Sequence, residues 1–228
     1  MQKVLPMSYY YISYQRQRRA YTAVKRLLDI VLSLVMLVAL LPLELVIAVI
    51  AAADTKGTPI FVQQRMGRYN KPFKMLKFRT MSVDAPANVA THKLSDAESY
   101  ISRVGGLLRK LSLDELPQLW NILKGDMSFI GPRPVVLTET ALLKRRRELG
   151  ADRVRPGITG LAQVKGRDDV PIRHKARYDA FYADHRSARL DGWILLRTVR
   201  FVITGAGIRE GAPAAPHAEH RHKSRSKY

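Results

Sequence analysis

The sequence contains no cysteine among its 228 residues, and acidic residues are scarce. The lack of cysteine excludes disulfides and thiolate metal sites, and it fits a reducing, cytosol-facing location. The 19 Asp and Glu residues are outnumbered by 39 Lys and Arg residues, so the formal net charge is +20. This charge predicts an anionic partner such as nucleic acid, anionic lipid or a phosphorylated substrate.

Long apolar runs are also scarce, and the only one extends from Leu27 to Ala53. It exceeds the roughly 20 residues that a membrane-crossing helix needs. However, Pro42 lies near its middle and Glu44 follows two residues later. Because proline removes a backbone donor and clashes with the preceding turn, we predict a kink or break there. A carboxylate is costly at the centre of a bilayer and less so at the headgroups.

Basic residues flank this run on both sides, whereas the first 28 residues contain no acidic residue. Lys and Arg near a membrane segment favour the cytoplasmic side. We therefore favour a re-entrant helix that enters one leaflet, breaks at Pro42 and returns to the same face. A single span is the alternative, and a signal peptide is disfavoured because the run is too long.

The sequence predicts an α+β fold, a small membrane-associated domain with amphipathic interfacial helices and a small sheet. Four segments are expected: a basic, aromatic segment at 1–26, the re-entrant helix at 27–53, a catalytic domain at 54–205, and a disordered basic tail at 206–228. Within the domain, strands are predicted at 58–64 and 72–81, with a short strand within 155–167. One helix is expected to end near Lys110 and a second near Leu123. Three more helices are predicted at 141–149, 171–187 and 193–203.

Asp114 and Glu115 are adjacent carboxylates at the start of a predicted helix. One interpretation is structural, since Ser112-x-x-Glu115 matches a capping box. The other is catalytic, because a helix N-terminus suits a phosphate, and a carboxylate can attack phosphorus while its neighbour acts as base or positions a metal. Attack on a phosphoanhydride also needs charge neutralisation, normally by Mg²⁺.

Several basic residues near this pair are candidates for phosphate contacts. Arg133 lies between two prolines, which fix its backbone and aim its guanidinium as a bidentate clamp requires. The alternative is an exposed arginine in a Pro-rich turn. Lys77, Arg79 and Arg109 either bind phosphates or are solvated surface charges. The cluster Lys144–Arg147 is interpreted as a solvated or lipid-facing surface.

Three stretches, PFKMLKFRTM, LSLDELPQLWNILKGDMSFIGPRP and RPGITGLAQVKGR, follow the Pro-interrupted run in this order. Together they resemble the bacterial sugar transferase family, the monotopic polyprenyl-phosphate phosphoglycosyl transferases, in its short single-module form. The resemblance covers roughly residues 25–204. It implies transfer of a phosphosugar from a UDP-sugar to undecaprenyl phosphate with release of UMP, at the cytoplasmic face of the bacterial inner membrane. Such a reaction initiates exopolysaccharide, capsule or other glycoconjugate synthesis.

The resemblance also implies roles for individual residues. Asp114 matches the nucleophile that forms a covalent phosphosugar intermediate, Glu115 matches the assisting base, and Mg²⁺ is required, with Asp114 as its ligand. The other matched positions are phosphate-binding Lys77, Arg79, Arg109 and Arg133, nucleotide or sugar contacts at Arg155, Gln163 and Arg167, and the helix-breaking Pro42. The implied partners are the UDP-sugar, undecaprenyl phosphate, anionic membrane lipids and downstream glycosyltransferases, with no nucleic acid.

The sequence departs from the family pattern at three positions. Leu41 replaces a serine before the proline, Leu161 stands where the family usually has tryptophan, and Lys165 replaces an asparagine. None of these three positions belongs to the acidic pair or its motif. They put the helix break and the nucleotide or sugar contacts in question.

Three other classes of function compete with this interpretation. A membrane-bound scaffold would keep the apolar run and the basic surface without needing Asp114, Glu115 and Arg133 in this arrangement. A nucleic-acid-binding protein would explain the charge, but the chain contains no recognised binding motif. A haloacid-dehalogenase-type phosphatase requires paired aspartates one residue apart near a strand end, and these are missing.

Overall fold

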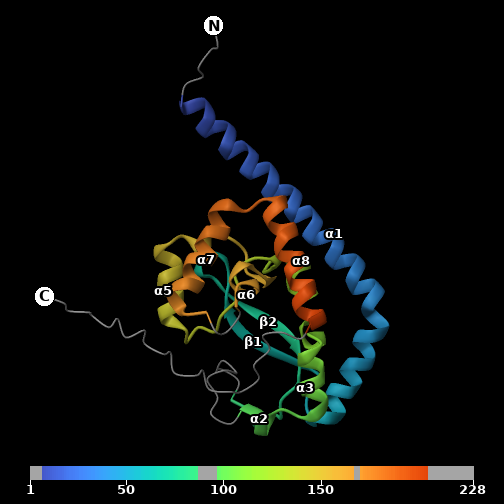
Figure 1. Ribbon diagram of the computed structural model, residues 1–228. Coiled ribbons are helices and arrows are strands. Elements are labelled where there is room, and N and C mark those ends of the chain that lie inside the picture. The colour runs from blue at the N-terminus through green and yellow to red at the C-terminus, as the bar shows by residue number, and fades with distance from the viewer. Residues whose placement is uncertain (1–6, 87–96, 167–169, 205–228) are drawn as a thin grey trace, which may run out of the picture.

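A computed structural model describes residues 7–86, 97–166 and 170–204 of the chain. One long helix, α1 (Met7–Thr55), runs along the side of a compact domain of short helices and strands (Figure 1). The α+β class predicted from the sequence is confirmed. The expected disordered tail at 206–228 and the predicted contact Arg167 lie outside the described residues.

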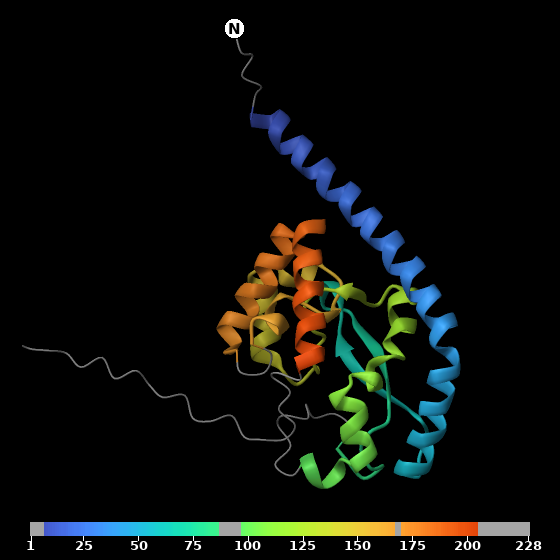
Figure 2. The same cartoon turned by 45° about the vertical axis from the view of Figure 1, so that its right-hand side comes forward.

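The helix α1 has 49 residues and is therefore roughly 74 Å long. The sequence predicted a break at Pro42, but the helix continues through this residue to Thr55. Figures 1 and 2 show that the helix curves in its second half, toward the lower part of the domain. The neighbouring Leu41 is 52% exposed, so the residue that replaces the family serine faces outward.

One face of α1 packs on the domain, and the other is apolar and exposed. Its stretch from Ala20 to Thr55 is long and apolar enough to cross a membrane, and only 11% of its most apolar window is buried. On the inner face, Met36, Leu37 and Leu40 pack against a core cluster that includes Leu119. Within the part of the chain that the structure describes, the exposed face therefore has no apolar partner.

Hydrogen bonds attach α1 to the domain at both ends of its apolar stretch. Near the start, Asp191 accepts bonds from Lys25 Nζ and Tyr21 Oη, both at 2.6 Å. Near the end, the hydroxyl of Ser102 donates to Asp54. Because Ser102 and Asp191 belong to the same domain, the two ends of the apolar stretch are held on one body.

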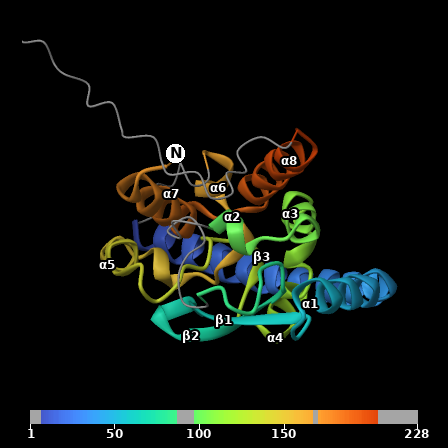
Figure 3. The same cartoon turned by 90° about the horizontal axis from the view of Figure 1, so that it is seen from below.

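The predicted strands at 58–64 and 72–81 are observed as an antiparallel hairpin. Strand β1 (Ile60–Met66) pairs with β2 (Pro72–Phe78), and the turn between them contains η1 (Arg68–Asn70). A second pair, β3 (Ser128–Ile130) and β4 (Gly157–Thr159), is parallel. Seen from below, the hairpin lies across the domain on the same side as the end of α1 (Figure 3).

Short helices connect and cover these strands. They are α2 (Ala97–Tyr100), α3 (Arg103–Lys110), η3 (Leu113–Glu115), α4 (Gln118–Lys124), α5 (Thr140–Glu148), η4 (Ala151–Arg153), α6 (Leu161–Val164), α7 (Ile172–His185) and α8 (Ala188–Thr204). A core cluster joins β3, α6, α7 and α8, and Leu161 is buried in it beside Tyr182 and Ile194. The departure at Leu161 therefore serves packing. The third departure, Lys165, places its Nζ 5.3 Å from the centre of the Trp193 ring.

Candidate active site

The acidic pair lies on the short helix η3, which two leucines anchor to the core. Leu113 and Leu116 pack against the cluster formed by Ile47, Phe78 and Leu108. Asp114 and Glu115 lie between these two leucines in the sequence, and their carboxylates meet Lys77 of β2. The pattern Leu-Asp-Glu-Leu thus fixes the two acids through their apolar neighbours.

The capping box predicted from Ser112 and Glu115 is not formed. Ser112 adopts a left-handed backbone conformation with φ of 57°, and its side chain makes no capping hydrogen bond. The Glu115 carboxylate instead accepts from Lys77 Nζ at 2.8 Å and from Arg133 Nη2 at 3.3 Å. The structural alternative for this pair therefore loses its main support.

Lys77 lies against both carboxylates. Its Nζ is 3.4 Å from Asp114 Oδ2 and 2.8 Å from Glu115 Oε1. All three side chains are largely buried, with 18%, 8% and 14% of the Lys77, Asp114 and Glu115 side chains exposed. Two carboxylates side by side are compatible with burial only when a cation compensates them.

Burial and the neighbouring charges shift the two acids in opposite directions. Burial raises the pKa of Asp114, and the charge of Lys77 only partly opposes this effect. Burial would also raise the pKa of Glu115, but the charges of Lys77 and Arg133 outweigh it and bring this pKa to about 2. Two adjacent carboxyl groups with separated pKa values are typical of an active site.

Arg133 is held in place by its backbone. Pro132 and Pro134 flank it, the Pro132 carbonyl accepts from Gly157 N at 3.0 Å, and the Pro134 carbonyl accepts from Arg65 Nη1 at 3.3 Å. Its own carbonyl accepts from Arg146 Nη1 at 2.9 Å. The side chain is 48% exposed, so it reaches Glu115 and still faces solvent.

The interpretation of Lys144–Arg147 as a solvated surface is wrong for Arg146. This residue is only 8% exposed, and its Nε and Nη2 bind Asp179 Oδ2 at 2.8 and 2.7 Å. Burial raises the pKa of Asp179, and the charge of Arg146 opposes the rise. The ion pair connects α5 to α7 directly behind the Arg133 loop.

We expect Arg146→Met to destabilise the protein by about 3–5 kcal/mol, because it leaves Asp179 charged and buried without a partner. Thermal unfolding measures this loss. The double variant Arg146→Met/Asp179→Leu should recover most of the stability, since neither charge is then buried. If Arg146→Met unfolds at the wild-type temperature, the pair does not support the domain.

The other two predicted phosphate contacts, Arg109 and Arg79, do not hydrogen-bond to the acidic pair in the described structure. Arg109 Nε donates to Thr80 Oγ1 at 2.8 Å, and its charge helps to lower the pKa of Asp114. Arg79 binds Thr58 through Nε at 2.8 Å and Nη2 at 2.9 Å. Arg79 is thus committed to the turn before β1 and is not brought to the carboxylates.

The predicted nucleotide or sugar contacts are also separated from the acidic pair. Arg155 Nε donates to the Gly125 carbonyl at 2.8 Å, just beyond the C-terminal end of α4. Gln163 Nε2 donates to the Ile158 carbonyl at 2.7 Å. Because η3 precedes the N-terminal end of α4, Asp114 and Arg155 lie at opposite ends of this helix.

Two residues near the pair were not singled out from the sequence. Asn121 Oδ1 accepts from Leu76 N at 3.0 Å, and its Nδ2 donates to the Lys74 carbonyl at 2.8 Å, which fixes α4 against β2. Arg65 is mostly buried, and burial together with the charge of Arg133 lowers its pKa to about 10. An asparagine in a short apolar helix and an arginine in a strand are the only signals that the sequence offered.

The described residues contain no group of three or more His, Cys, Asp or Glu side chains that could hold a metal ion. The acidic pair alone can offer one or two carboxylate ligands. Mg²⁺ is often bound in this way, with the remaining positions filled by substrate phosphates and water. The residues therefore fit a magnesium ion that arrives with its substrate, and they do not form a complete protein cage.

Comparison with known proteins adds independent information. A family model described as bacterial sugar transferase matches residues 20–205. The chain is 38% identical over 194 residues to UDP-N-acetylgalactosamine-undecaprenyl-phosphate N-acetylgalactosaminephosphotransferase of Aeromonas hydrophila. It is 37% identical over 198 residues to the exopolysaccharide production protein ExoY of Sinorhizobium fredii, and 37% identical over 188 residues to undecaprenyl-phosphate glucose phosphotransferase of Komagataeibacter xylinus.

The lengths of these relatives differ. The alignment covers 83% of this chain but 46% of the Aeromonas protein, and 77% of this chain but 35% of the Komagataeibacter protein. It covers 80% of this chain and 87% of ExoY. The chain therefore spans less than half of two of these relatives and most of the third.

Proposed function

Because this chain belongs to the bacterial sugar transferase family, we propose that it is a phosphoglycosyl transferase that moves a phosphosugar from a UDP-sugar to undecaprenyl phosphate. The names of two relatives include undecaprenyl phosphate as a substrate, and one includes a UDP-sugar. The named sugars are N-acetylgalactosamine and glucose, so the relatives do not agree on one sugar. The product would begin a polysaccharide or another glycoconjugate.

The observation that carries this proposal is the buried acidic pair in contact with Lys77 and Arg133. A diphosphate that approaches Asp114 meets the half-exposed guanidinium of Arg133, whose planar fork matches two phosphate oxygens. Lys77 lies at the carboxylates and supplies a second positive charge. This arrangement neutralises charge at the phosphorus that a carboxylate would attack.

The proposed reaction has two displacements at one site. In the first, an Asp114 carboxylate oxygen bonds to the phosphorus that bears the sugar, and the phosphoanhydride bond to UMP breaks. In the second, a phosphate oxygen of undecaprenyl phosphate bonds to the same phosphorus, and the bond to Asp114 breaks. UMP leaves before the lipid reacts, so ping-pong kinetics are expected.

Glu115 is better suited to orienting cations than to accepting a proton. Its pKa of about 2 means that it is ionised and weakly basic while Lys77 and Arg133 hold it. The attacking phosphate loses its second proton near pH 6, so it needs little help from a base at neutral pH. We therefore assign Glu115 first to the positioning of Lys77 and Arg133, and a base role requires substrate phosphates to draw these cations away.

Mg²⁺ would be held by Asp114, with Glu115 within reach as a second carboxylate ligand. When bound, it would neutralise the diphosphate and stabilise the departing UMP oxygen. Lys77 already contacts both carboxylates, so the lysine and the metal would share this charge. The chain's own contribution is to hold the carboxylate, the lysine and the arginine in fixed positions.

We further propose that the exposed apolar face of α1 lies in the inner membrane without carrying the domain across it. A helix that crosses separates its ends by about 30 Å of hydrocarbon. Here Lys25 and Asp54, on either side of the apolar stretch, both bind the same domain. Exposed Leu107 of α3 and Leu196 of α8 would extend the membrane-facing surface. Such a monotopic position, with basic residues at both ends of the apolar stretch, would keep the domain on the cytoplasmic face.

This topology predicts that tags at the N-terminus and after Thr204 are both accessible only from the cytoplasmic side. Protease protection in spheroplasts and in inverted vesicles measures the accessibility of each tag. Pro42→Ala should straighten α1 and move a fraction of the molecules into a true span. A periplasmic N-terminus in the wild type would contradict the monotopic position.

We expect Arg133→Lys to lower kcat/KM for the UDP-sugar by about tenfold or more, because the charge remains but the two-point fork is lost. Steady-state UMP release measures this effect. The matched control is Arg145→Lys, at an exposed arginine that pairs with Glu148 on α5. If lysine serves equally well at 133, the two prolines that frame this residue have no role in binding phosphate.

The proposed function itself is tested by incubating the purified protein with undecaprenyl phosphate and a panel of UDP-sugars while UMP is measured. At least one UDP-sugar should yield UMP together with a lipid-linked phosphosugar. If no member of the panel yields UMP, a non-enzymatic scaffold at the membrane becomes the better interpretation.

A further inference from the structure

A second polar site lies beside residues 22–29 of α1, away from the acidic pair. It is a hollow of about 400 Å³ between the start of the apolar stretch, the hairpin turn and the end of α7. Six basic side chains line it, against the single carboxylate of Asp29: Lys25, Arg26, Arg68, Arg153, Arg155 and Arg186. The acidic pair lies at the opposite end of α4, roughly 10 Å of helix away.

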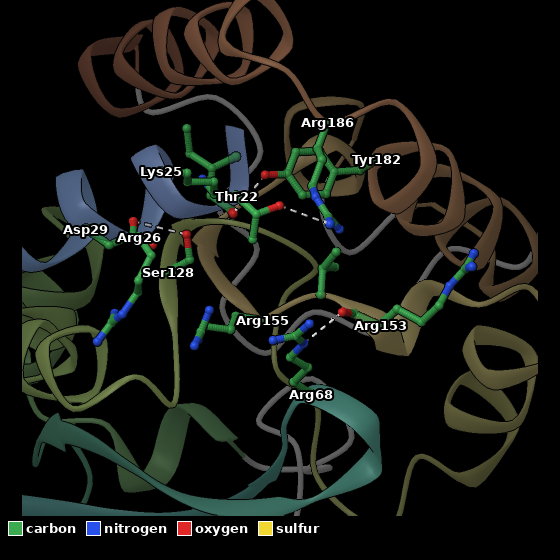
Figure 4. Close-up of a pocket in the computed structure, with 12 residues that line it drawn as sticks. Thr22, Lys25, Arg26, Asp29, Arg68, Ser128, Arg153, Arg155, Tyr182 and Arg186 are labelled. Atoms are coloured by element: carbon green, nitrogen blue, oxygen red, sulfur yellow. Dashed lines mark hydrogen bonds between the residues drawn. The ribbon is translucent and has the colours of Figure 1, made fainter. Parts of the chain in front are cut away.

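Two of these cations have carboxylate partners outside the hollow. Lys25 pairs with Asp191 at 2.6 Å, and Arg153 pairs with Asp184 at 2.9 Å. Figure 4 shows the Arg153 side chain pointing away from the hollow. Among the described residues, Asp29 accepts from two neutral donors, the Ser128 hydroxyl and the Phe129 backbone N–H. The positive charge inside the hollow therefore comes mainly from the other arginines.

Arg26, Arg68 and Arg155 form no ion pair with a carboxylate of the described residues. Arg26 donates to the carbonyls of Ile122 and Leu123 at 2.6 and 2.9 Å, and Arg155 donates to that of Gly125. These carbonyls are the C-terminal end of α4, which offers only about half an elementary negative charge. Together with the single carboxylate of Asp29, this charge is too small to balance the three guanidinium groups.

Arg68 differs from Arg26 and Arg155 because its hydrogen bonds do not go to the carbonyls at the end of α4. Its Nε donates to the Arg153 carbonyl at 2.8 Å, and its Nη2 donates to Tyr69 Oη at 2.8 Å. Figure 4 shows its guanidinium beside that of Arg155. Burial, and then the charges of Arg26 and Arg68, lower the pKa of Arg155, as expected where positive charges are crowded. A bound anion would relieve this repulsion.

We propose that this hollow binds a phosphate group, carried by an anionic lipid of the membrane in which α1 lies. Arg26 immediately precedes Leu27 and Leu28, whose side chains are 61% and 53% exposed, so the hollow lies at the level along α1 where the apolar face begins. Lipid phosphates occupy this level of a bilayer. The inference rests on the proposed membrane position of α1 and is independent of the transferase reaction.

The test uses the full-length protein in a neutral detergent and measures its unfolding temperature against added phosphatidylglycerol. Phosphatidylcholine with the same acyl chains controls for apolar binding, and inorganic phosphate probes a soluble source. Phosphatidylglycerol should stabilise the wild type saturably, and Arg68→Gln should weaken its apparent Kd by about tenfold, the loss of one charge-assisted hydrogen bond. Arg68→Lys, which keeps the charge, should lie between the two.

Arg145→Gln is the matched control, because it removes the same charge from an exposed arginine that pairs with Glu148 on α5 and does not line the hollow. Its apparent Kd should stay within about twofold of the wild type. If both variants weaken phosphatidylglycerol binding equally, or if neither does, the hollow is not the binding site. Stabilisation by inorganic phosphate without any by phosphatidylglycerol would overturn the lipid as the source. No UDP-sugar is present, so a failure here is distinct from a failure of the transferase proposal.

Discussion

Asp114→Asn should lower turnover by a factor on the order of 10³ or more while the protein stays folded and membrane-bound. The amide has the shape of the carboxylate but cannot attack phosphorus as an anion. The variant should lose little stability, because burial raises the pKa of Asp114 and the folded protein therefore gains nothing from its charge. UMP release and thermal unfolding measure the two effects separately.

The matched control for this variant is Asp184→Asn. Asp184 makes the same type of ion pair, with Arg153, but its side chain is 45% exposed. Its replacement should leave turnover within about twofold of the wild type, since exposed ion pairs contribute little. An Asp114→Asn protein that retains a tenth of wild-type turnover would remove Asp114 from the role of nucleophile.

Lys77→Met should have the second largest effect, because it leaves two adjacent, buried carboxylates without their shared cation. Turnover should fall on the order of 10²-fold, with the loss mainly in kcat, since the charge of Lys77 acts at the reacting phosphorus. Lys77→Arg keeps the charge and should retain part of the activity. If Lys77→Met and wild type turn over equally fast, the contacts at 2.8 and 3.4 Å have no role in the reaction.

The pH dependence of the same variant gives a second test. Only ionised Asp114 reacts, so activity is present above its pKa and disappears as the pH falls through it. Lys77 lowers this pKa against the effect of burial, so its removal should move the acidic limb of kcat to higher pH. A limb that stays in place, or moves to lower pH, would show that another group controls it.

The fold could be predicted where local sequence decides the structure. The β1–β2 hairpin and helices α5 and α7 follow from apolar alternation, turn residues and periodicity, and the observed bounds differ from the predicted ones by a few residues. Pro42 was different. Its missing donor predicted a break, but contacts on both sides of this residue, at Leu40 and Ile47, hold the helix against the domain. Tertiary packing thus turned the break into a curve.

The site was predictable as a list of residues but not as an arrangement. Asp114, Glu115, Lys77 and Arg133 meet in space, whereas Arg79 binds Thr58. Lys77 and Arg79 are only two residues apart, but β2 ends at Phe78 between them. The buried pair of Arg146 with Asp179 was missed, because charge in a basic helix gives no sign of which member turns inward.

The most direct test of the covalent mechanism omits the lipid acceptor. The wild-type protein is mixed with the UDP-sugar that supports turnover, UMP is counted per enzyme, and the peptide that contains Asp114 is examined by mass spectrometry. We expect release of at most about one UMP per enzyme and a phosphosugar adduct on that peptide, absent in Asp114→Asn. UMP that appears only after undecaprenyl phosphate is added, with no adduct, would contradict it and indicate direct transfer in a ternary complex.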